Sequence, residues 1–584
     1  MDFVQLLLRS GTSDELLEKI DHDRHSMSTE ALLSVEKFLC NALSLIRNSF
    51  NSMLPVNRLA PEILADIFER LIGPAYIKEE GLDVFRWPSS SLRYPLPLKD
   101  ISCVCQQWRE ICVDTGTLWT DILDPDFLHA VPMFVERSKS APLHVSVSPA
   151  TRGPFIDSLF QLHGSRIKEL HLMFRHKFGH YTGRWRPPTW EDVSHCVDYP
   201  APALEELRLH AVLLYYSTNR SDGSSTPRIL FRGVTPRLKS LIISSNDWLP
   251  RNHFGSLIRL CLDGYDRRTW TLIEMVTFLL GCPSLEEVII HSLYRRPYEE
   301  YQHSDDTLPS VVWPYLCRLV IGRMEPSLAS WILRHITIPE CVALRIFSVF
   351  RQSDGGEDAG NVGDVLNSLF LLDYPVVMQL CASSGMPLVA LADATRGIRL
   401  DSILPTPLDV TQVWMHQLWT TLPLSKVTKL LLIETSDRLE VDTLFEFLTS
   451  LSTLVYSQGY KLGHLEYPEH ERVHFLTRFL ALLTPTDQNN ISCPSLSTLD
   501  IHTPCSPNML DTILEFAQRR ARLGYPLQKL IIELEAGASN SSHDWTSLAS
   551  CVEGFEIRPG GGPPPTLDWP AVCGGPTHEL WPAW

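Results

Sequence analysis

The chain of 584 residues lacks any concentration of positive charge. It carries 51 Lys and Arg against 68 Asp and Glu, a formal net charge of −17. Because binding a phosphate backbone requires basic side chains gathered in one place, this composition argues against a nucleic-acid partner. Hydrophobic residues at 44% and charged residues at 20% are ordinary for a globular protein. We therefore expect most of the chain to fold.

Long apolar runs are also missing. No stretch reaches the roughly 18 uninterrupted apolar residues of a spanning helix, and Asp373 interrupts the best candidate, near residues 365–392. The first residues place Asp2 where a secretory signal needs positive charge, and Arg9 breaks their apolar run. These features predict a cytoplasmic or nuclear protein that has no membrane partner.

Cysteine is present without a pattern. The fourteen cysteines run from Cys40 to Cys573 with no regular spacing, which favours reduced, mostly buried thiols over a disulfide framework. Cys103 and Cys105 are separated by one residue, and no C-x-x-C pair exists to complete a zinc site. We interpret both as core thiols.

The signatures of common enzymes are absent as well. The chain has no G-x-S-x-G, no Walker loop and no G-x-G-x-x-G. His470 and His474 fit H-E-x-x-H, a helical zinc motif, but the glycine and the third histidine of one zincin class are missing at positions 477 and 480. We expect no catalytic residue, no metal and no cofactor. A metal-dependent hydrolase at these two histidines is a remote alternative.

The first fifty residues read as a helical lead-in. From about Ser28, apolar residues recur at intervals of three or four, which predicts one continuous apolar stripe on a helix. Its members are Leu32, Val35, Leu39, Ala42, Leu43, Ile46 and Phe50. We expect a later part of the chain to cover this stripe.

Residues 51–125 predict two further amphipathic helices. The first begins at Pro61, where a missing N–H costs nothing, and the second carries apolar residues between Leu98 and Ile111. The line TGTLWTDI closes this region. A stretch rich in Pro, Ser and aromatics, residues 73–97, lies between the helices.

The runs LAPEILADIFERL and LKDISCVCQQWREICVDTGTLWTDI resemble the F-box. The order of a Leu-Pro-x-Glu-Leu-Leu start, an Ile-Phe pair, a Val-Cys-x-x-Trp core and a later Leu-Trp carries the resemblance. The matching residues are Leu59, Glu62, Ile63, Leu64, Ile67, Phe68, Leu71, Val104, Cys105, Trp108, Leu118 and Trp119. Two departures are Ala60 at the usual proline position, with Pro61 one place later, and the long connector at residues 73–97.

The F-box is a small helical module that docks onto the Skp-family adaptor of cullin-based ubiquitin ligases. The resemblance implies that Pro61 belongs to the docking region with the matched residues. It also implies that contact, or the packing behind it, comes from Pro61, Ile63, Leu64, Ile67, Phe68, Val104 and Trp108. The flanking segments are similar to those of F-box proteins common in fungi.

Beyond residue 126 a pattern recurs: apolar, two others, apolar, one other, apolar. Its ten occurrences begin at Ile167, Leu204, Leu238, Leu257, Leu285, Leu316, Leu344, Val427, Leu496 and Leu527. A proline stands two residues before five of them, where 42 prolines in 584 residues predict fewer than one. Proline ends an incoming helix and allows a strand to begin. The two longest intervals, on either side of Val427, leave room for further units.

The pattern resembles a degenerate leucine-rich repeat. The predicted fold class is α/β: an N-terminal helical F-box module followed by an irregular leucine-rich-repeat-like α/β solenoid across residues 126–535. An ordinary α/β domain with a mostly parallel sheet is the alternative. Residues 536–584 are expected to hold a last element and a flexible Pro/Gly-rich tail, whose three tryptophans could dock elsewhere or fold back onto the end of the solenoid.

Together these expectations describe a non-enzymatic substrate receptor of an SCF-type ubiquitin ligase. The F-box would bind the Skp-family adaptor and the cullin ligase core, and the repeat region would bind a protein substrate of unknown identity. A repeat scaffold that is not coupled to ubiquitination is the main alternative.

Overall fold

The computed structural model of the protein contains two compact units. Unit 1 comprises residues 1–78 and 87–143, and unit 2 comprises residues 79–86 and 144–584. The residues described are 14–15, 18, 21–22, 25, 28–72, 96–123, 130–147, 154–174, 194, 196–211, 228–244, 248–264, 271–293, 309–348, 365, 375–383, 386–401, 408–434, 443–458, 469–484, 491–505, 507–534, 545–559, 567–574 and 581.

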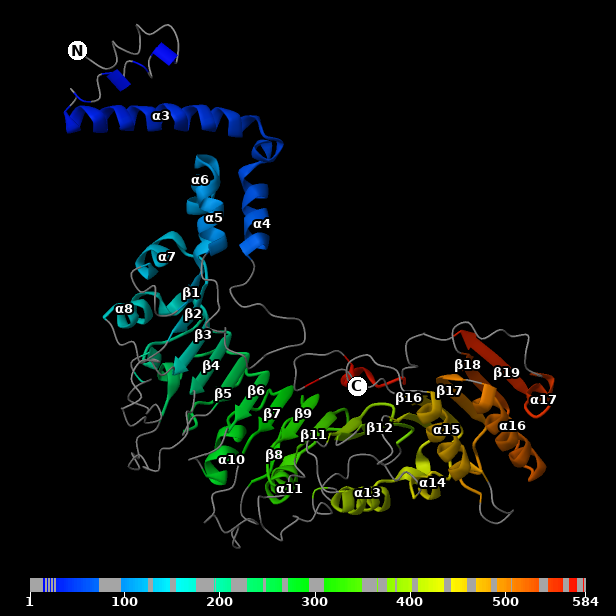
Figure 1. Ribbon diagram of the computed structural model, residues 1–584. Coiled ribbons are helices and arrows are strands. Elements are labelled where there is room, and N and C mark those ends of the chain that lie inside the picture. Colours follow the sequence, from blue (N-terminus) through cyan, green and yellow to red (C-terminus); the bar gives the residue numbers. More distant parts are fainter. Residues whose placement is uncertain are drawn as a thin grey trace. The chain divides into compact units, whose positions relative to one another are not determined.

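Unit 1 is mainly helical (Figure 1). Its longest element is α3, which begins next to Ser28, where the sequence predicted a helix to start. The Ser28 hydroxyl caps the helix by accepting the N–H of Ala31 at 3.2 Å. The elements are α3 (Thr29–Met53), η1 (Pro55–Arg58), α4 (Pro61–Ile72), α5 (Leu96–Val104), α6 (Gln106–Asp114), η2 (Gly116–Trp119), β1 (Asp121–Leu123) and α7 (Val131–Arg137).

Unit 2 is built on one long sheet that is mostly parallel. The strands, from β2, are β2 (Leu143–Val147), β3 (Ile167–Phe174), β4 (Glu206–Ala211), β5 (Ser240–Ser244), β6 (Arg259–Asp263), β7 (Glu287–His291), β9 (Arg318–Gly322), β11 (Ala343–Phe347), β14 (Gly397–Asp401), β13 (Met386–Ala392), β12 (Val377–Ser383), β15 (Lys429–Glu434), β16 (Thr453–Gln458), β17 (Thr498–Cys505), β18 (Lys529–Leu534) and β19 (Gly554–Pro559). From β3 onward each strand pairs with the next in this order. Among these described strands, β13 alone runs antiparallel to its neighbours.

Helices connect many of these parallel strands. They are α8 (Pro154–His163), α10 (Leu272–Leu280), α11 (Pro326–His335), α13 (Leu408–Thr421), α14 (Leu444–Phe447), α15 (Glu469–Leu483), α16 (Pro507–Arg522) and α17 (Trp545–Ala549). Short turns η3 (Gly164–Arg166), η4 (Leu230–Gly233), η6 (Leu424–Lys426) and η7 (Ala571–Cys573), and a small parallel pair of β8 (Val311–Val312) with β10 (Ile336–Thr337), complete the unit. Three of the helices, α10, α11 and α16, come shortly before the repeats that the sequence placed at Leu285, Leu344 and Leu527.

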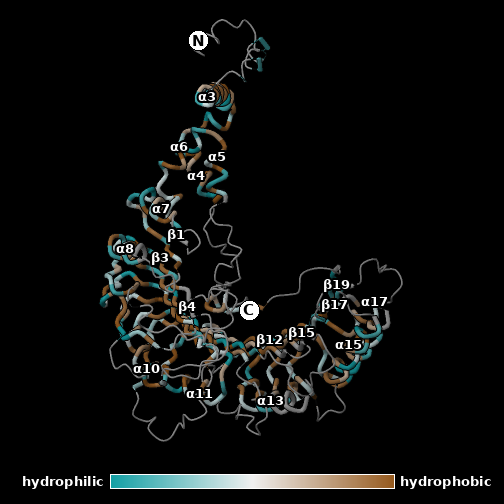
Figure 2. The backbone as a smooth tube through the Cα atoms, turned by 60° about the vertical axis from the view of Figure 1, so that its left-hand side comes forward, coloured by the Kyte–Doolittle hydropathy of each residue, from teal (hydrophilic) through white to brown (hydrophobic). Residues whose placement is uncertain are grey.

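The helices from α10 to α16 follow one side of the strand row (Figure 1), and the strands are mostly hydrophobic (Figure 2).

Among the described residues, no helix is long and apolar enough to cross a membrane.

The apolar residues of the recurring pattern lie in register across the sheet. Leu207 pairs with Leu170 on one side and with Leu241 on the other, and all three side chains are fully buried. Since successive residues of a strand point to opposite faces, these leucines define one face, called the inner face here, and the residues between them define the outer face. The predicted repeat positions therefore identify the buried side of the sheet.

One predicted repeat has the wrong register. The sequence assigned Leu344 to the first apolar position and Phe347 to the second, but Leu344 pairs with Leu319 and occupies the second position itself. Phe347 is consequently on the outer face, and Val349 lies outside the described residues. The error arises because both faces of this strand carry apolar residues, so the pattern does not fix which face is buried first.

The two long intervals contain additional strands. β14 and β12, with the antiparallel β13, fill the gap before Val427, and β16 fills the gap after it. In β16, Leu454 pairs with Leu430, while Tyr456 occupies the last apolar position. This repeat escaped the apolar pattern because tyrosine was not counted as an apolar residue.

Proline has a specific place before the strands. The N–H of Leu204 donates to the carbonyl of Ala201 at 3.2 Å, and the N–H of Leu238 donates to the carbonyl of Thr235 at the same distance. Pro202 is thus the second residue of a four-residue turn, a position that suits its fixed φ. Leu257 closes an equivalent turn without proline. The turn, rather than proline itself, is the shared element.

A second recurring turn follows three adjacent strands. Ser292, Arg323 and Ser348, which come directly after β7, β9 and β11, have φ values of 56°, 47° and 51°. This left-handed conformation costs an ordinary residue roughly 1–2 kcal/mol. Each N–H donates at 3.0 Å to a carbonyl at the end of the neighbouring strand. This hydrogen bond offsets the conformational cost and links one repeat to the next.

Candidate interaction surfaces

A small apolar core holds the helices of unit 1 together. Leu64 and Phe68 lie one turn apart on α4, and both side chains are completely buried. The ring centroid of Phe68 is 4.9 Å from that of Trp108 on α6. The indole N–H of Trp108 donates to Oδ1 of Asn57 at 2.6 Å. The core therefore fixes α6 against both α4 and η1.

The expected second helix is in fact two helices. α5 ends at Val104, and Cys105 has an extended backbone (φ −156°, ψ 172°) before α6 begins at Gln106. The Cys105 sulfur accepts the backbone N–H of Trp108 at 3.5 Å, as an N-cap side chain does. The prediction of one continuous helix is wrong because this cap starts a new helix in the middle of the apolar pattern.

The closing Trp119 is a core residue. Its side chain is buried, and its indole N–H donates to the carbonyl of Cys112 at 2.7 Å. The Phe134 ring meets it edge-on at 5.0 Å, and the guanidinium of Arg137 lies 4.5 Å from its ring centroid. Trp119 therefore supports unit 1 from within and offers little surface to a partner.

Other residues of the predicted docking region face solvent. Ile63 and Leu71 are 50% and 61% exposed, and the half-buried Ile67 lies between them at a spacing of four residues. These three residues are called the α4 stripe. Leu59, Pro61 and Val104 are also exposed. The predicted residues thus separate into a buried set, which stabilises the unit, and an exposed apolar set.

The apolar stripe of α3 is not covered, contrary to expectation. Val35 is buried, but Leu43, Ile46 and Phe50 are all more than two-fifths exposed. The side-chain amide of Asn48 on α3 donates to Oε1 of Gln106, the first residue of α6, at 2.9 Å. Unit 1 therefore presents apolar side chains on both α3 and α4.

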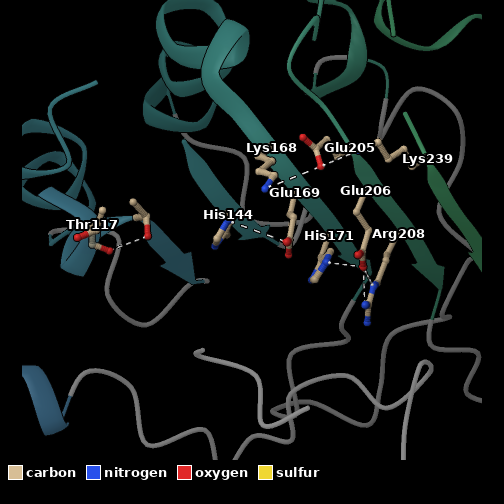
Figure 3. Close-up of polar contacts among 10 residues, drawn as sticks. Thr117, His144, Lys168, Glu169, His171, Glu205, Glu206, Arg208 and Lys239 are labelled. Atoms are coloured by element: carbon tan, nitrogen blue, oxygen red, sulfur yellow. Dashed lines mark hydrogen bonds and ion pairs between the residues drawn. The ribbon is translucent and has the colours of Figure 1, made fainter. Parts of the chain in front are cut away.

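The outer face of unit 2 is charged at the β3 end. Figure 3 shows His171, Glu206 and Arg208 on β3 and β4, with the Glu206 carboxylate between the imidazole and the guanidinium. Nε2 of His171 is 3.5 Å from Oε1 of Glu206. Lys168 and Lys239 flank Glu205 at 3.8 and 3.6 Å. Opposite charges thus alternate along this end of the sheet.

Burial shapes the protonation of this group. It lowers the pKa of His171 below the ordinary 6.5, with the charge of Arg208 adding to the effect and Glu206 opposing it. Burial alone would raise the pKa of the Glu206 carboxyl, but hydrogen bonds and charges from His171 and Arg208 bring it to about 2. Glu206 therefore keeps its charge throughout the physiological range.

The middle of the outer face is apolar and is covered by the C-terminal part of the chain. Residues 567–574 and Trp581 are called the tail segment. Cys573 and Trp581 are fully buried in a cluster with Val320 and Phe347, which extends across β5, β6, β7, β9 and β11. Leu567 is buried in a second cluster on β15 and β16. Trp569 packs against both clusters.

Polar contacts also hold the tail segment. Arg318 on β9 donates to the carbonyls of Val572 and Gly574 at 3.4 and 3.0 Å, and its guanidinium lies 5.5 Å from the ring centroid of Trp581. Lys429 on β15 is 3.7 Å from the Asp568 carboxylate. Both strands therefore supply a cation near the segment.

Between the two apolar clusters lies an ion-paired group. Arg345 donates to the Asp401 carboxylate at 2.6 Å and Arg399 donates to the same carboxylate at 3.0 Å. All three side chains are about nine-tenths buried. The outer face therefore has two separate apolar patches, and the tail segment contacts both.

Part of the segment that was expected to be a flexible tail packs on the sheet. Trp569 and Trp581 pack back on the middle of the sheet rather than on its end, and Trp584 lies outside the described residues. Docking of the tail on another molecule stays a prediction. Periodicity could not reveal this contact, because the tail segment meets strand residues more than 100 positions away in the sequence. The available signal was large apolar residues within a Pro/Gly-rich segment.

The metal motif does not gather a ligand set. His470 and His474 are exposed on α15, and Arg472 between them is buried. Among the described residues, no group of three or more His, Cys, Asp or Glu side chains could hold a metal ion.

All fourteen cysteines are free thiols. Cys105 is buried as expected, but Cys103 is exposed on the outside of α5, so its interpretation as a core thiol is wrong. At the tail segment, burial raises the pKa of Cys573 to about 12, which keeps this thiol protonated.

No family of known proteins matches this sequence, and no curated protein matches it either.

Proposed function

We propose that the protein is a substrate receptor of an SCF-type ubiquitin ligase, acting in the cytoplasm or nucleus. Unit 1 would dock on a Skp-family adaptor, and the outer face of unit 2 would bind the target. The observation that carries the proposal is the division of the F-box-like residues, in which Leu64 and Phe68 form a core and Ile63 and Leu71 are exposed. Exposed apolar residues backed by a packed core are suited to binding another protein.

We further propose that unit 2 is a degenerate leucine-rich-repeat solenoid. The support is that leucines of successive repeats lie in register and that the same four-residue turn precedes several strands. After β7, β9 and β11, a left-handed residue in each case donates its N–H to the end of the neighbouring strand, so these connections are also repeated. Such an array presents one broad face for recognition.

A receptor of this kind works by proximity. Holding a target beside a ubiquitin-loaded enzyme raises the effective concentration of the target's lysines. No residue of the receptor needs to change protonation or form a covalent bond.

The docking step is tested by affinity capture of the full-length chain followed by detection of the adaptor and cullin. We expect both with the native chain, and at least tenfold less of each with Ile63→Asp plus Leu71→Asp. Both positions are exposed, so the charges should leave unit 1 folded, whereas aspartate at Leu64 or Phe68 would enter the core. Leu45→Asp, at a 69% exposed position on α3, is the matched control.

Failure of the native chain to recover the adaptor would overturn the docking proposal. If the adaptor is recovered but the half-life of captured partners does not depend on the α4 stripe, the protein is a scaffold instead.

A further inference from the structure

The tail segment occupies the outer face much as a bound peptide would. It contacts the sheet through side chains that are distant in sequence, with Leu567 at the patch on β15 and β16 and Trp581 at the patch on β5 to β11. The buried Arg345–Asp401 pair separates these patches. The segment therefore crosses several strands while most of its specific contacts are made at two places.

The contacts define what this surface accepts. Apolar strand residues such as Ile242, Ile289 and Leu431 receive a leucine and large aromatic rings. Arg318 binds main-chain carbonyls, which every peptide carries, and also lies near an indole face. Lys429 offers a positive charge to an acidic residue beside the first aromatic one. These features favour a protein segment rather than a small molecule.

We propose that the outer face of unit 2 binds an extended segment of a target protein that carries a leucine and an acidic residue next to a tryptophan, with a second tryptophan further along. The tail segment is an intramolecular occupant of the same surface and competes with the target. The chain itself supplies the pattern in Leu567, Asp568, Trp569 and Trp581. The inference deepens the proposed function by naming the class of target.

Competition follows from shared contacts. Val320 and Phe347 cannot contact the tail segment and a second aromatic anchor at the same time, since Cys573 and Trp581 already bury them. A tethered occupant has a high effective concentration, so a target must displace it. Weakening the tail segment should therefore strengthen binding in trans.

The test uses the full-length chain and a labelled synthetic peptide with the sequence of residues 566–584. The chain with Trp569→Ser plus Trp581→Ser, in which the tail segment is released, should bind the peptide with a Kd at least tenfold lower than the native chain does. The same peptide with both tryptophans replaced by serine should bind neither. Tyr315→Ser, at an exposed aromatic position of unit 2, is the matched control and should behave as the native chain.

A further variant identifies the surface. Adding Arg318→Ala to the released chain should weaken peptide binding by at least tenfold, because two carbonyl contacts are lost. Equal peptide affinity for the native and released chains, or no binding to a released chain that retains the native circular dichroism, would overturn the inference.

If the released chain does not fold, the native chain decides. Excess isotope-labelled peptide should accelerate hydrogen exchange of residues 567–574 in the native chain, and unchanged exchange would also overturn the inference. No adaptor is present in these measurements. Their failure therefore rejects the target class alone, whereas failure of adaptor capture rejects the proposed function.

Discussion

The two units handle apolar surface in opposite ways. Unit 1 leaves Ile63 and Leu71 in solvent on α4 and Phe50 in solvent on α3. Unit 2 covers the apolar patches of its outer face with its own C-terminal segment. The apolar patches of unit 2 are removed from water without a partner. The exposed apolar side chains of α3 and α4 are not covered by any described residue, so burying them against a second molecule would be favourable.

This difference also concerns the timing of binding. The exposed residues of α4 can meet a partner at once, and the outer face must first lose its occupant. If unit 1 docks on an adaptor as we propose, that binding should be insensitive to changes in the tail segment. The following substitutions test whether the contrast between an open and a covered apolar surface is sound.

The largest effect should come from the core behind the open surface. Phe68→Ala removes a fully buried ring that contacts Trp108, and we expect a loss of about 3–5 kcal/mol in the stability of unit 1. Ile63→Ala, at an exposed position, should cost only about 0.5 kcal/mol. Hydrogen exchange of residues 61–72 measures both. Similar costs would mean that the α4 stripe is structural and that unit 1 has no open surface.

An intermediate effect should come from the covered surface. A methyl group on Gly322 would approach the Phe347 ring to 2.2 Å, so Gly322→Ala forces this ring, part of the cluster under the tail segment, to move. Overpacking of this kind costs about 1–3 kcal/mol. We expect faster hydrogen exchange of residues 567–574.

Gly255→Ala is the control for that substitution, because its added methyl group would make only ordinary contact with His253, at 3.7 Å. If the two variants show the same exchange, the tail segment does not depend on the fit of the cluster and the contrast between the units is weakened.

The smallest effect concerns the charged end of the outer face. Burial lowers the pKa of His171 below 6.5, so the unfolded chain takes up a proton first as the pH falls. The contribution of neutral His171 to the free energy of unfolding is therefore fully present above the unfolded-state pKa of about 6.5. It decreases as the pH falls from there towards the folded-state pKa, by at most about 1.4 kcal/mol per pH unit for one proton.

His171→Gln should therefore flatten the dependence of stability on pH below 6.5, as measured by denaturant unfolding. His470→Gln, at an exposed position of α15, is the control. An unchanged slope in the His171 variant would show that this end of the sheet is more open to water than the covered middle.

Local patterns predicted the sheet well where they were unambiguous. Leu207 and Leu241 were placed correctly, since a turn residue before each strand and alternating burial point to one register. Leu344 was misplaced because Ile346 and Phe347 make both faces of β11 apolar. The repeat that contains Tyr456 was missed because tyrosine was not counted as an apolar residue.

For the docking region of unit 1, the sequence could predict which residues belong to it but not which of them are exposed. The sequence singled out Leu64 and Ile63 together, but their neighbours on other helices decide that one is buried and the other exposed. The break at Cys105 depends on a capping contact that no apolar period reveals. The tail segment was beyond local inference because Trp581 meets residues that are remote in sequence.

The antiparallel strand in the middle of unit 2 has a consequence for folding. β12 and β13 pair from Val377 with Ala392 to Ser383 with Met386, so their contacts close short loops, whereas each parallel pair must bring together segments separated by a connection across the sheet. Local pairs form faster because less chain entropy is lost before the first contact. β13 pairs equally locally with β14, from Ala392 with Gly397 to Leu388 with Asp401. We therefore expect this hairpin and its β14 partner to form before the parallel strands are added on either side. The tail segment, which needs strands on both sides of that hairpin, would be the last part to dock.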